Sequence, residues 1–261
     1  MASRPKILIT NDDGVFAPGI RHLAEVLKEM ADITIIAPQH EQSATGLSIT
    51  VRTPLETQQV LWPCGTKAIA VSGKPADCVK MALSALLDFT PDLIVSGINR
   101  GSNAGRNIFY SGTVAAVIEG VLHDVPGIAF SCCNYNKPDY STAQGHVASI
   151  VKYVLEHPMP NGTFLNVNFP CNPNKKYQGF KLARLGKEYW AENPDQRQHP
   201  VEESSYWWLG FRRAEYEEHE ESDIALLKQG YVTAVPVQIS ELTDTRYLQE
   251  KSSSFEQHFP L

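Results

Sequence analysis

Oxygen-bearing side chains that can hold a cation follow three apolar runs in the first hundred residues. These residues, with the runs that they follow, are Asp12 and Asp13 after Lys6–Thr10, Ser43 after Ile33–Ala37, and Asn99 after Asp92–Ser96. Two adjacent carboxylates repel each other, so either one keeps its proton or a cation lies between them. With hydroxyl and amide oxygens they form a donor set that suits Mg²⁺ or Mn²⁺ better than zinc. The alternative is that Asp12 and Asp13 only cap the following helix and turn the chain.

A second feature is a loop rich in glycine and asparagine, residues 97–107, which leads to the start of an apolar helix at Ser111, Gly112 and Thr113. Backbone N–H groups at a helix N-terminus, supplemented by hydroxyl donors, can hold a phosphate group. A helix cap without a ligand is the alternative for these hydroxyls. The loop matches neither GxGxxG after a first strand nor GxxxxGK[ST], which disfavours NAD and Walker-type nucleotide binding.

Apolar runs alternate with helical patterns up to residue 170, which predicts an α/β fold of the doubly wound, Rossmann-like kind, with a mostly parallel sheet and helices on both faces. The expected strands are 6–10, 33–37, 67–71, 92–96, 126–131, 163–169 and 231–239, and the expected helices begin at Pro18, Pro75, Thr113 and Gln144. Ligands of such sheets bind at the carboxyl ends of the strands, where the strand order reverses. We therefore expect the three oxygen-bearing segments to meet at one edge.

The composition changes after about residue 170. Residues 184–223 contain Trp190, Trp207 and Trp208 among many charged residues, which favours extended arms or hairpins. If the sheet is complete by residue 170, these aromatic side chains must pack elsewhere, and we expect arms exchanged between the subunits of a homodimer or homotetramer. Packing onto the same chain is the alternative. We expect a single domain, 1–261, with the core sheet and the site in 1–170 and the arms and last strands in 171–261.

Composition excludes several classes of protein. The 261 residues are 43% hydrophobic and 20% charged, as in an average globular domain, and the net charge of −6 gives no basic face for duplex nucleic acid. No apolar run has the length of a membrane span, so we expect no membrane partner. The N-terminus lacks the apolar core of a signal peptide, from which we expect a cytoplasmic protein.

Several motifs in order along the chain resemble the SurE family of survival-protein nucleotidases. They are Thr10-Asn-Asp-Asp-Gly14, Ala17-Pro-Gly-Ile20, Ala37-Pro38 with Gln42-Ser43, Pro75-Ala-Asp-Cys-Val79, Ser96-Gly-Ile-Asn99, Tyr110-Ser-Gly-Thr-Val-Ala-Ala116, Asn166-Val-Asn-Phe-Pro170 and the stretch 223–232. The resemblance implies a metal-dependent phosphatase acting on nucleoside 5′- and 3′-monophosphates, with polyphosphate as a further substrate in some members. One departure is Lys74, where the family more often has Thr.

The resemblance assigns one divalent cation per subunit, Mg²⁺ or Mn²⁺, to Asp12, Asp13, Ser43 and Asn99. We therefore expect a nucleotidase that hydrolyses nucleoside monophosphates to nucleoside and phosphate. The expected phosphate contacts are Asn99, Ser111, Gly112 and Thr113, which would also stabilise developing charge. The expected catalytic group is Asp12, Asp13, Asn11 and Asn99, with Asn11 orienting the phosphate or a ligand carboxylate.

Two other classes of function share part of this pattern. A non-catalytic nucleotide- or phosphate-binding regulatory protein could use the same cradle, and only a turnover assay separates it from an enzyme. A phosphorylated receiver domain also carries an acidic pair after its first strand. It needs an acceptor aspartate at the end of a central strand, whereas Asp92 begins its strand and Asn99 follows it.

Overall fold

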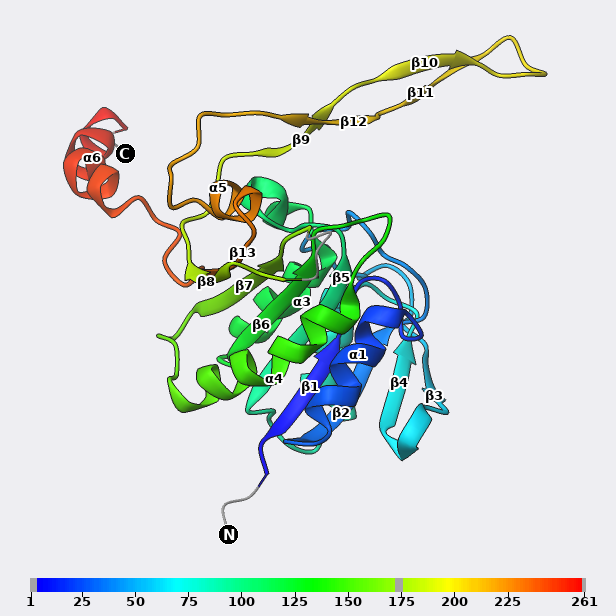
Figure 1. Cartoon of the computed structure of the whole chain (residues 1–261). Helices are drawn as coiled ribbons and strands as arrows, with labels where there is room; N and C mark the ends of the chain where they lie inside the picture. The colour runs from blue at the N-terminus through cyan, green and yellow to red at the C-terminus, as the bar shows by residue number, and fades with distance from the viewer. Residues whose placement is uncertain (1–3, 172–175, 260–261) are drawn as a thin grey trace.

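The computed structural model describes residues 4–171 and 176–259, and a nine-stranded sheet forms its centre (Figure 1). The strands of this sheet are β1 (Lys6–Thr10), β2 (Asp32–Pro38), β3 (Thr57–Val60), β4 (Lys67–Val71), β5 (Leu93–Arg100), β6 (Gly127–Cys132), β7 (Thr163–Phe169), β8 (Gly179–Leu182) and β13 (Tyr231–Gln238). Their order is β3-β4-β2-β1-β5-β6-β7-β13-β8. All neighbouring strands are parallel except β3 with β4 and β13 with β7, which confirms the mostly parallel sheet.

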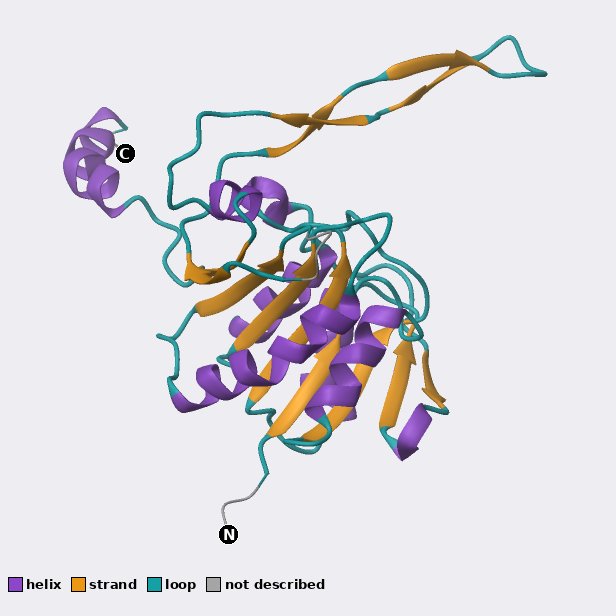
Figure 2. Cartoon of the chain, viewed as in Figure 1, coloured by secondary structure: helices purple, strands orange, loops and turns teal. Residues whose placement is uncertain are grey.

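Helices cover both faces of this sheet, as the sequence predicts (Figure 2). On one face α1 (Pro18–Leu27) packs against α4 (Tyr140–Glu156), and on the other α2 (Pro75–Met81) packs against α3 (Gly112–Val121). The π-helical turn η2 (Ala82–Leu86) continues α2. Helix α1 buries Ile20, Leu23 and Leu27, whose spacing places them on one side of the helix. The inner strands carry apolar side chains on both faces, so each face of the sheet has its own hydrophobic cluster.

Several strands of the sheet differ from the prediction. Strand β5 does not end before Asn99 but continues to Arg100, with a shift of register toward β6 between Ser96 and Asn99. Gly97 permits this shift with a φ of +122°, because a Cβ there would lie 2.3 Å from the carbonyl oxygen of Phe130. The sheet also extends beyond residue 170, since β13 and β8 add to its edge. Strand β3 lies in a segment with no predicted strand, and its polar, exposed residues suit an edge position.

The C-terminal region forms the predicted hairpins. Strands β9 (Tyr189–Glu192) and β12 (Phe211–Ala214) pair antiparallel, and β10 (Asp195–Gln198) pairs with β11 (Ser205–Trp208) farther along the same projection (Figure 1). Helix α5 (Asp223–Lys228) leads back to β13. Helix α6 (Thr245–His258), which the polar composition did not predict, begins where Asp244 accepts a hydrogen bond from the backbone N–H of Tyr247, and it has no buried residue.

Two short 3₁₀ turns, η1 (Pro63–Gly65) and η3 (Gly105–Phe109), complete the described elements. Helix α4 begins at Tyr140 rather than Gln144, because Asp139 caps it through a hydrogen bond from the Thr142 backbone N–H. Within the residues that the structure describes, no helix has the length and apolar character needed to cross a membrane.

Candidate functional site

The candidate site lies where the strand order of the sheet reverses. Strand β1 has β2 on one side and β5 on the other, so the segments after these strands diverge and leave room for a ligand. The turn after β1 is joined to the segment after β2, because Gln42 N–H donates to the Asp12 carbonyl at 2.7 Å. That segment is joined to the start of α3 by a hydrogen bond of 3.0 Å from Gly46 N–H to the Tyr110 carbonyl.

Asp12 and Asp13 place two carboxylates at this edge in different surroundings. Asp12 is only 4% exposed, and the hydroxyl of Thr113 donates to its Oδ1. Burial raises the pKa of Asp12 to about 7, and the charge of Asp13 contributes to the same rise. Asp13 is half-buried and accepts a hydrogen bond from the Arg100 backbone N–H at 3.1 Å, and burial raises its pKa too. Both carboxylates therefore lack enough positive charge nearby to offset their loss of water.

Helix α3 begins directly against Asp12. A Cβ on Gly112 would lie 2.8 Å from the Asp12 Cβ and 3.1 Å from its Oδ2, so only glycine allows this approach. Ser111 caps the helix, because its hydroxyl oxygen accepts a hydrogen bond from the Val114 backbone N–H at 3.1 Å. The Ser111 hydroxyl hydrogen remains able to donate to a ligand. The carboxylate and the positive end of α3 therefore lie in contact.

The other predicted residues surround this contact. Asn11 is buried, and its Nδ2 donates to the Gly14 carbonyl at 2.9 Å, while its Oδ1 has no hydrogen-bond partner among the described residues. Asn99 is nearly buried, and its Nδ2 donates to the Gly101 carbonyl at 3.0 Å. Ser43 is exposed, and its hydroxyl donates to Glu41 at 2.7 Å. A hydroxyl that donates its hydrogen keeps lone pairs for another partner, so Ser43 can still offer oxygen to a ligand.

The donor set fits a hard divalent cation. It combines the two carboxylates with neutral oxygens, and the unpaired Asn11 Oδ1 lies at the same edge. Thr10 and Ser96, which are register partners on β1 and β5, also hold buried hydroxyls without a partner. Within residues 4–171 and 176–259, no group of three or more His, Cys, Asp or Glu side chains is arranged around a common point. A ligand set with more carboxylates, or with thiolates, is thus not available in this part of the chain.

Arg100 and Glu41 belong to the site but were not predicted from the sequence. Their side chains form a salt bridge of 3.4 Å between segments that follow different strands, and Glu41 also accepts the Ser43 hydroxyl. Arg100 follows Asn99 directly, and Glu41 lies two residues before Ser43. This closeness in sequence to the predicted ligands is the signal from which both residues could have been predicted.

Two buried asparagines of β7 hold the glycine-rich segment that follows β5. Asn168 Oδ1 accepts the Asn103 backbone N–H at 3.0 Å, and Asn166 Nδ2 donates to the Asn103 carbonyl at 2.9 Å. The backbone N–H and the carbonyl of Asn103 are therefore both held by side chains of β7, which lies two positions from β5 in the sheet. These contacts position the segment between Asn99 and Ser111.

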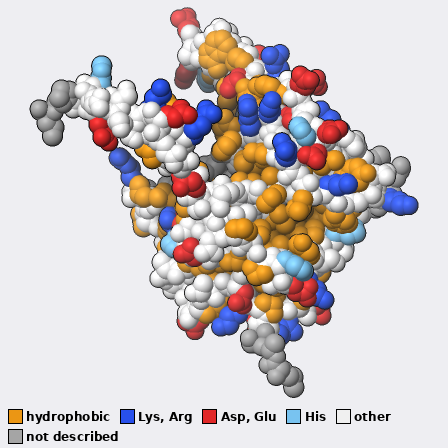
Figure 3. Space-filling view, turned by 90° about the vertical axis from the view of Figure 1, so that its left-hand side faces the viewer, with side chains coloured by type: hydrophobic (Ala, Val, Ile, Leu, Met, Phe, Trp, Pro, Cys, Tyr) orange, Lys and Arg blue, Asp and Glu red, His pale blue; other side chains and the backbone are white. Residues whose placement is uncertain are grey.

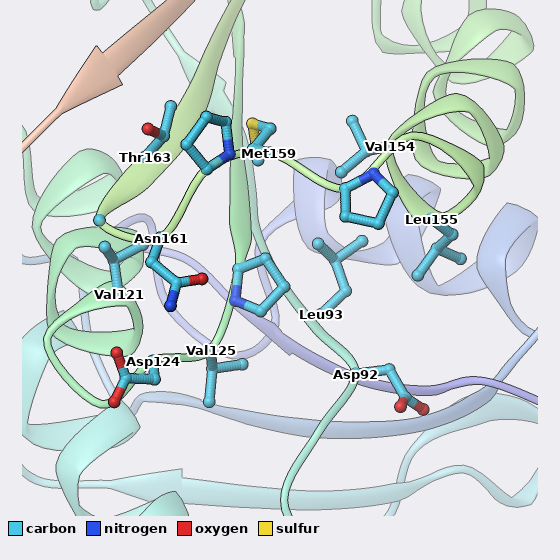
Figure 4. A pocket seen from close by; sticks show the side chains of 14 residues that line it. Asp92, Leu93, Val121, Asp124, Val125, Val154, Leu155, Met159, Asn161 and Thr163 are labelled. Atoms are coloured by element: carbon cyan, nitrogen blue, oxygen red, sulfur yellow. The ribbon is translucent and has the colours of Figure 1, made fainter.

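A separate hollow of about 190 Å³ lies at the other end of the strands, where their amino ends are (Figure 4). Leu93, Pro126 and Thr163 line it, and these residues stand at the beginnings of β5, β6 and β7. Most other lining side chains are apolar, as Val125, Leu155 and Met159 in Figure 4 illustrate. None of the predicted site residues contributes to it.

The strand order and the oxygen-rich edge define a doubly wound α/β protein whose candidate site lies at the switch point. The family model described as Survival protein SurE matches residues 7–192. A protein of Protochlamydia amoebophila named 5′-nucleotidase SurE is 54% identical over 257 residues, which cover 98% of this chain and 98% of that protein. One of the same name from Christiangramia forsetii is 40% identical over 96% of each chain.

Similarity extends to a solved structure. The crystal structure of the SurE protein from Aquifex aeolicus superposes with a TM-score of 0.82 at 32% sequence identity, covering 96% of this chain and 100% of that one. The chain belongs to the SurE family.

Proposed function

We propose that this chain is a nucleotidase that hydrolyses nucleoside 5′-monophosphates to nucleoside and phosphate. Its relatives named 5′-nucleotidase SurE support this activity. The proposal extends to 3′-monophosphates and short polyphosphate, since each of them presents a phosphoryl group to the same donors. A regulatory protein that only binds nucleotides is the less favoured alternative.

The proposed cation is Mg²⁺ or Mn²⁺, one per subunit, held by Asp12, Asp13, Ser43 and Asn99. When bound, such a cation supplies Lewis acidity toward a phosphate ester and offsets negative charge. The two carboxylates lie buried and half-buried, and burial raises the pKa of both despite the charge of Arg100 near Asp13, which supports this assignment.

The proposed phosphate contacts are the Ser111 and Thr113 hydroxyls, the backbone N–H groups around Gly112, and the amide of Asn99. The backbone N–H groups and the Ser111 hydroxyl lie at the positive end of α3, and Asn99 lies on β5. The Thr113 hydroxyl would turn from Asp12 to donate to a phosphoryl group. Donors that are already in place stabilise charge that develops on phosphate oxygens during hydrolysis. Asn11, buried beside Asp12, orients the carboxylate or the phosphate.

The observation that carries the proposal is the contact between Asp12 and the first residue of α3. A Cβ on Gly112 would lie 2.8 Å from the Asp12 Cβ, and this closeness supports a cation at Asp12 beside a phosphate at the helix end. The test is phosphate release from AMP by the full chain, first with EDTA and then after excess Mn²⁺ or Mg²⁺ is restored. We expect activity that EDTA removes and metal restores, and its near-complete loss in Asp13→Asn at saturating metal. AMP binding without release of phosphate would instead establish the regulatory alternative.

We further propose that the hairpins of residues 184–223 mediate a homodimer or homotetramer. Trp207 is 61% exposed and Trp208 is 63% exposed, so their own chain leaves most of their surface uncovered. Hydrophobic side chains are visible on the projection at the top of Figure 3. A large exposed aromatic group on a projecting hairpin is typical of a subunit contact.

A further inference from the structure

Tyr135 lies at the same edge of the sheet as the candidate site. It stands between β6 and α4, directly after the carboxyl end of β6. Strand β6 is the neighbour of β5, which is in turn the neighbour of β1. The loop that carries Tyr135 is therefore adjacent to the strand end that carries Asn99 and near the turn that carries Asp13.

Arg100 connects the site to the Tyr135 ring. Its backbone N–H donates to Asp13 at 3.1 Å, while its guanidinium lies 4.6 Å from the centroid of the Tyr135 ring. A guanidinium in this position attracts the face of an aromatic ring and restricts its orientation. A Cβ on Gly101 would lie 3.3 Å from Tyr135 Cδ2, so the glycine backbone also borders the ring. The ring is thus held one arginine side chain away from a site carboxylate.

The ring is nevertheless 56% exposed, although Arg100 lies against one of its faces. An exposed aromatic ring with a restricted orientation is a suitable surface for stacking a nucleobase, because every base has a π-face. In a nucleoside monophosphate the ribose separates the base from the phosphate by about the length of an arginine side chain. A phosphate held beside Asp13 would leave its base within reach of Tyr135, because Arg100 connects that carboxylate to the ring.

We propose that Tyr135 stacks on the base of the nucleotide and that Arg100 holds the Tyr135 ring in place. This inference rests on the proposed function and adds the part of the site that recognises the nucleoside. Stacking tolerates any base, so it favours nucleotides over other phosphomonoesters without selecting one nucleotide. Two other exposed rings, Phe109 and Tyr110, lie on the segment before α3 and are the competing platforms.

The experiment compares a substrate with a base and one without it. AMP and ribose 5-phosphate share the ribose and the ester, so their kcat/KM ratio isolates the base. Tyr135→Ala should lower kcat/KM for AMP about tenfold, mainly through KM, and leave ribose 5-phosphate unchanged. Tyr135→Phe keeps the ring and should behave like the wild type. Tyr153→Ala is the matched control, because Tyr153 is 58% exposed on α4 and stacks on His157 away from the site.

Inhibition by adenosine tests binding of the base without hydrolysis of AMP. Adenosine should inhibit the hydrolysis of ribose 5-phosphate by the wild type and lose this effect about tenfold in Tyr135→Ala. Equal losses with both substrates, no loss with AMP, or a loss that follows Tyr110→Ala instead would overturn the inference while the proposed function stands. If the wild type hydrolyses neither substrate with metal present, the proposed function fails and this inference fails with it.

Discussion

Asp12→Asn tests the electrostatics of the site without relying on activity. A carboxylate whose pKa lies at about 7 instead of 3.8 costs the folded state roughly 4 kcal/mol when it is ionised. Between about pH 4 and pH 7 the folded chain holds a proton that the unfolded chain has released. The free energy of unfolding of the metal-free protein should therefore fall as pH rises through this range, and it should stop falling above it.

Asparagine keeps the shape of the side chain and its oxygen can still accept the Thr113 hydroxyl, but it carries no charge. In EDTA at pH 8, Asp12→Asn should be more stable than the wild type by about 2 kcal/mol, since burying the amide N–H₂ offsets part of the gain. The wild type alone should be stabilised by Mn²⁺, by about 2.7 kcal/mol at a hundred times its Kd.

The assay is urea unfolding followed by circular dichroism at pH 5 and pH 8, with EDTA or Mn²⁺, at one protein concentration. Asp32→Asn is the control, because the Asp32 side chain is 66% exposed. It lies at the first residue of β2, at the end of the strand away from the site. Parallel pH dependence in the wild type and Asp12→Asn, or equal stabilisation of both by Mn²⁺, would refute the reasoning.

Four further outcomes follow from the contacts of the site and its support. Ser111→Ala should cost about 1 kcal/mol of stability and also weaken inhibition by inorganic phosphate; a loss of stability alone would reduce Ser111 to a helix cap. Gly112→Ala should abolish phosphate release from AMP, because its Cβ would lie 2.8 Å from the Cβ of Asp12, and wild-type turnover would disprove this contact. Asp223→Ala removes the acceptor of three backbone N–H groups and should lower the free energy of unfolding by about 3 kcal/mol in urea titrations, whereas an unchanged midpoint would contradict this role. Deletion of residues 186–222 should give a monomeric or insoluble chain by light scattering, and a wild-type mass near one chain of 29.0 kDa would refute the assembly proposal.

The edge on which the site lies could be predicted from the sequence for a simple reason. The runs before Asp12 and Ser43 are apolar on both faces, and such runs become inner parallel strands whose carboxyl ends meet. The register of β1 and β5 then follows from the sheet, with Thr10 opposite Ser96. The apolar runs and the rule that parallel strands end at the same side of a sheet were sufficient to predict this edge.

The ends of elements and the partners of charged residues could not be predicted in this way. Strand β5 continues to Arg100 because Gly97 adopts a φ of +122° against Phe130, which periodicity does not reveal. The salt bridge between Arg100 and Glu41 joins residues 59 positions apart in the sequence. Helix α6 begins at the Asp244 cap, and none of its residues is buried. Its polar composition therefore resembles that of a C-terminal tail without secondary structure.

The electrostatic balance of the site indicates what kind of ligand it requires. Hydrogen bonds from Thr113 lower the pKa of Asp12, yet burial and Asp13 outweigh them. The charge of Arg100 lowers the pKa of Asp13 but does not outweigh burial, and its guanidinium also lies against Glu41 and Tyr135. The edge is therefore negative beside the same helix end that offers donors to an anion. A phosphate dianion gains from those donors but is repelled by Asp12 and Asp13, so a divalent cation must bind with it for the two halves of the site to act together.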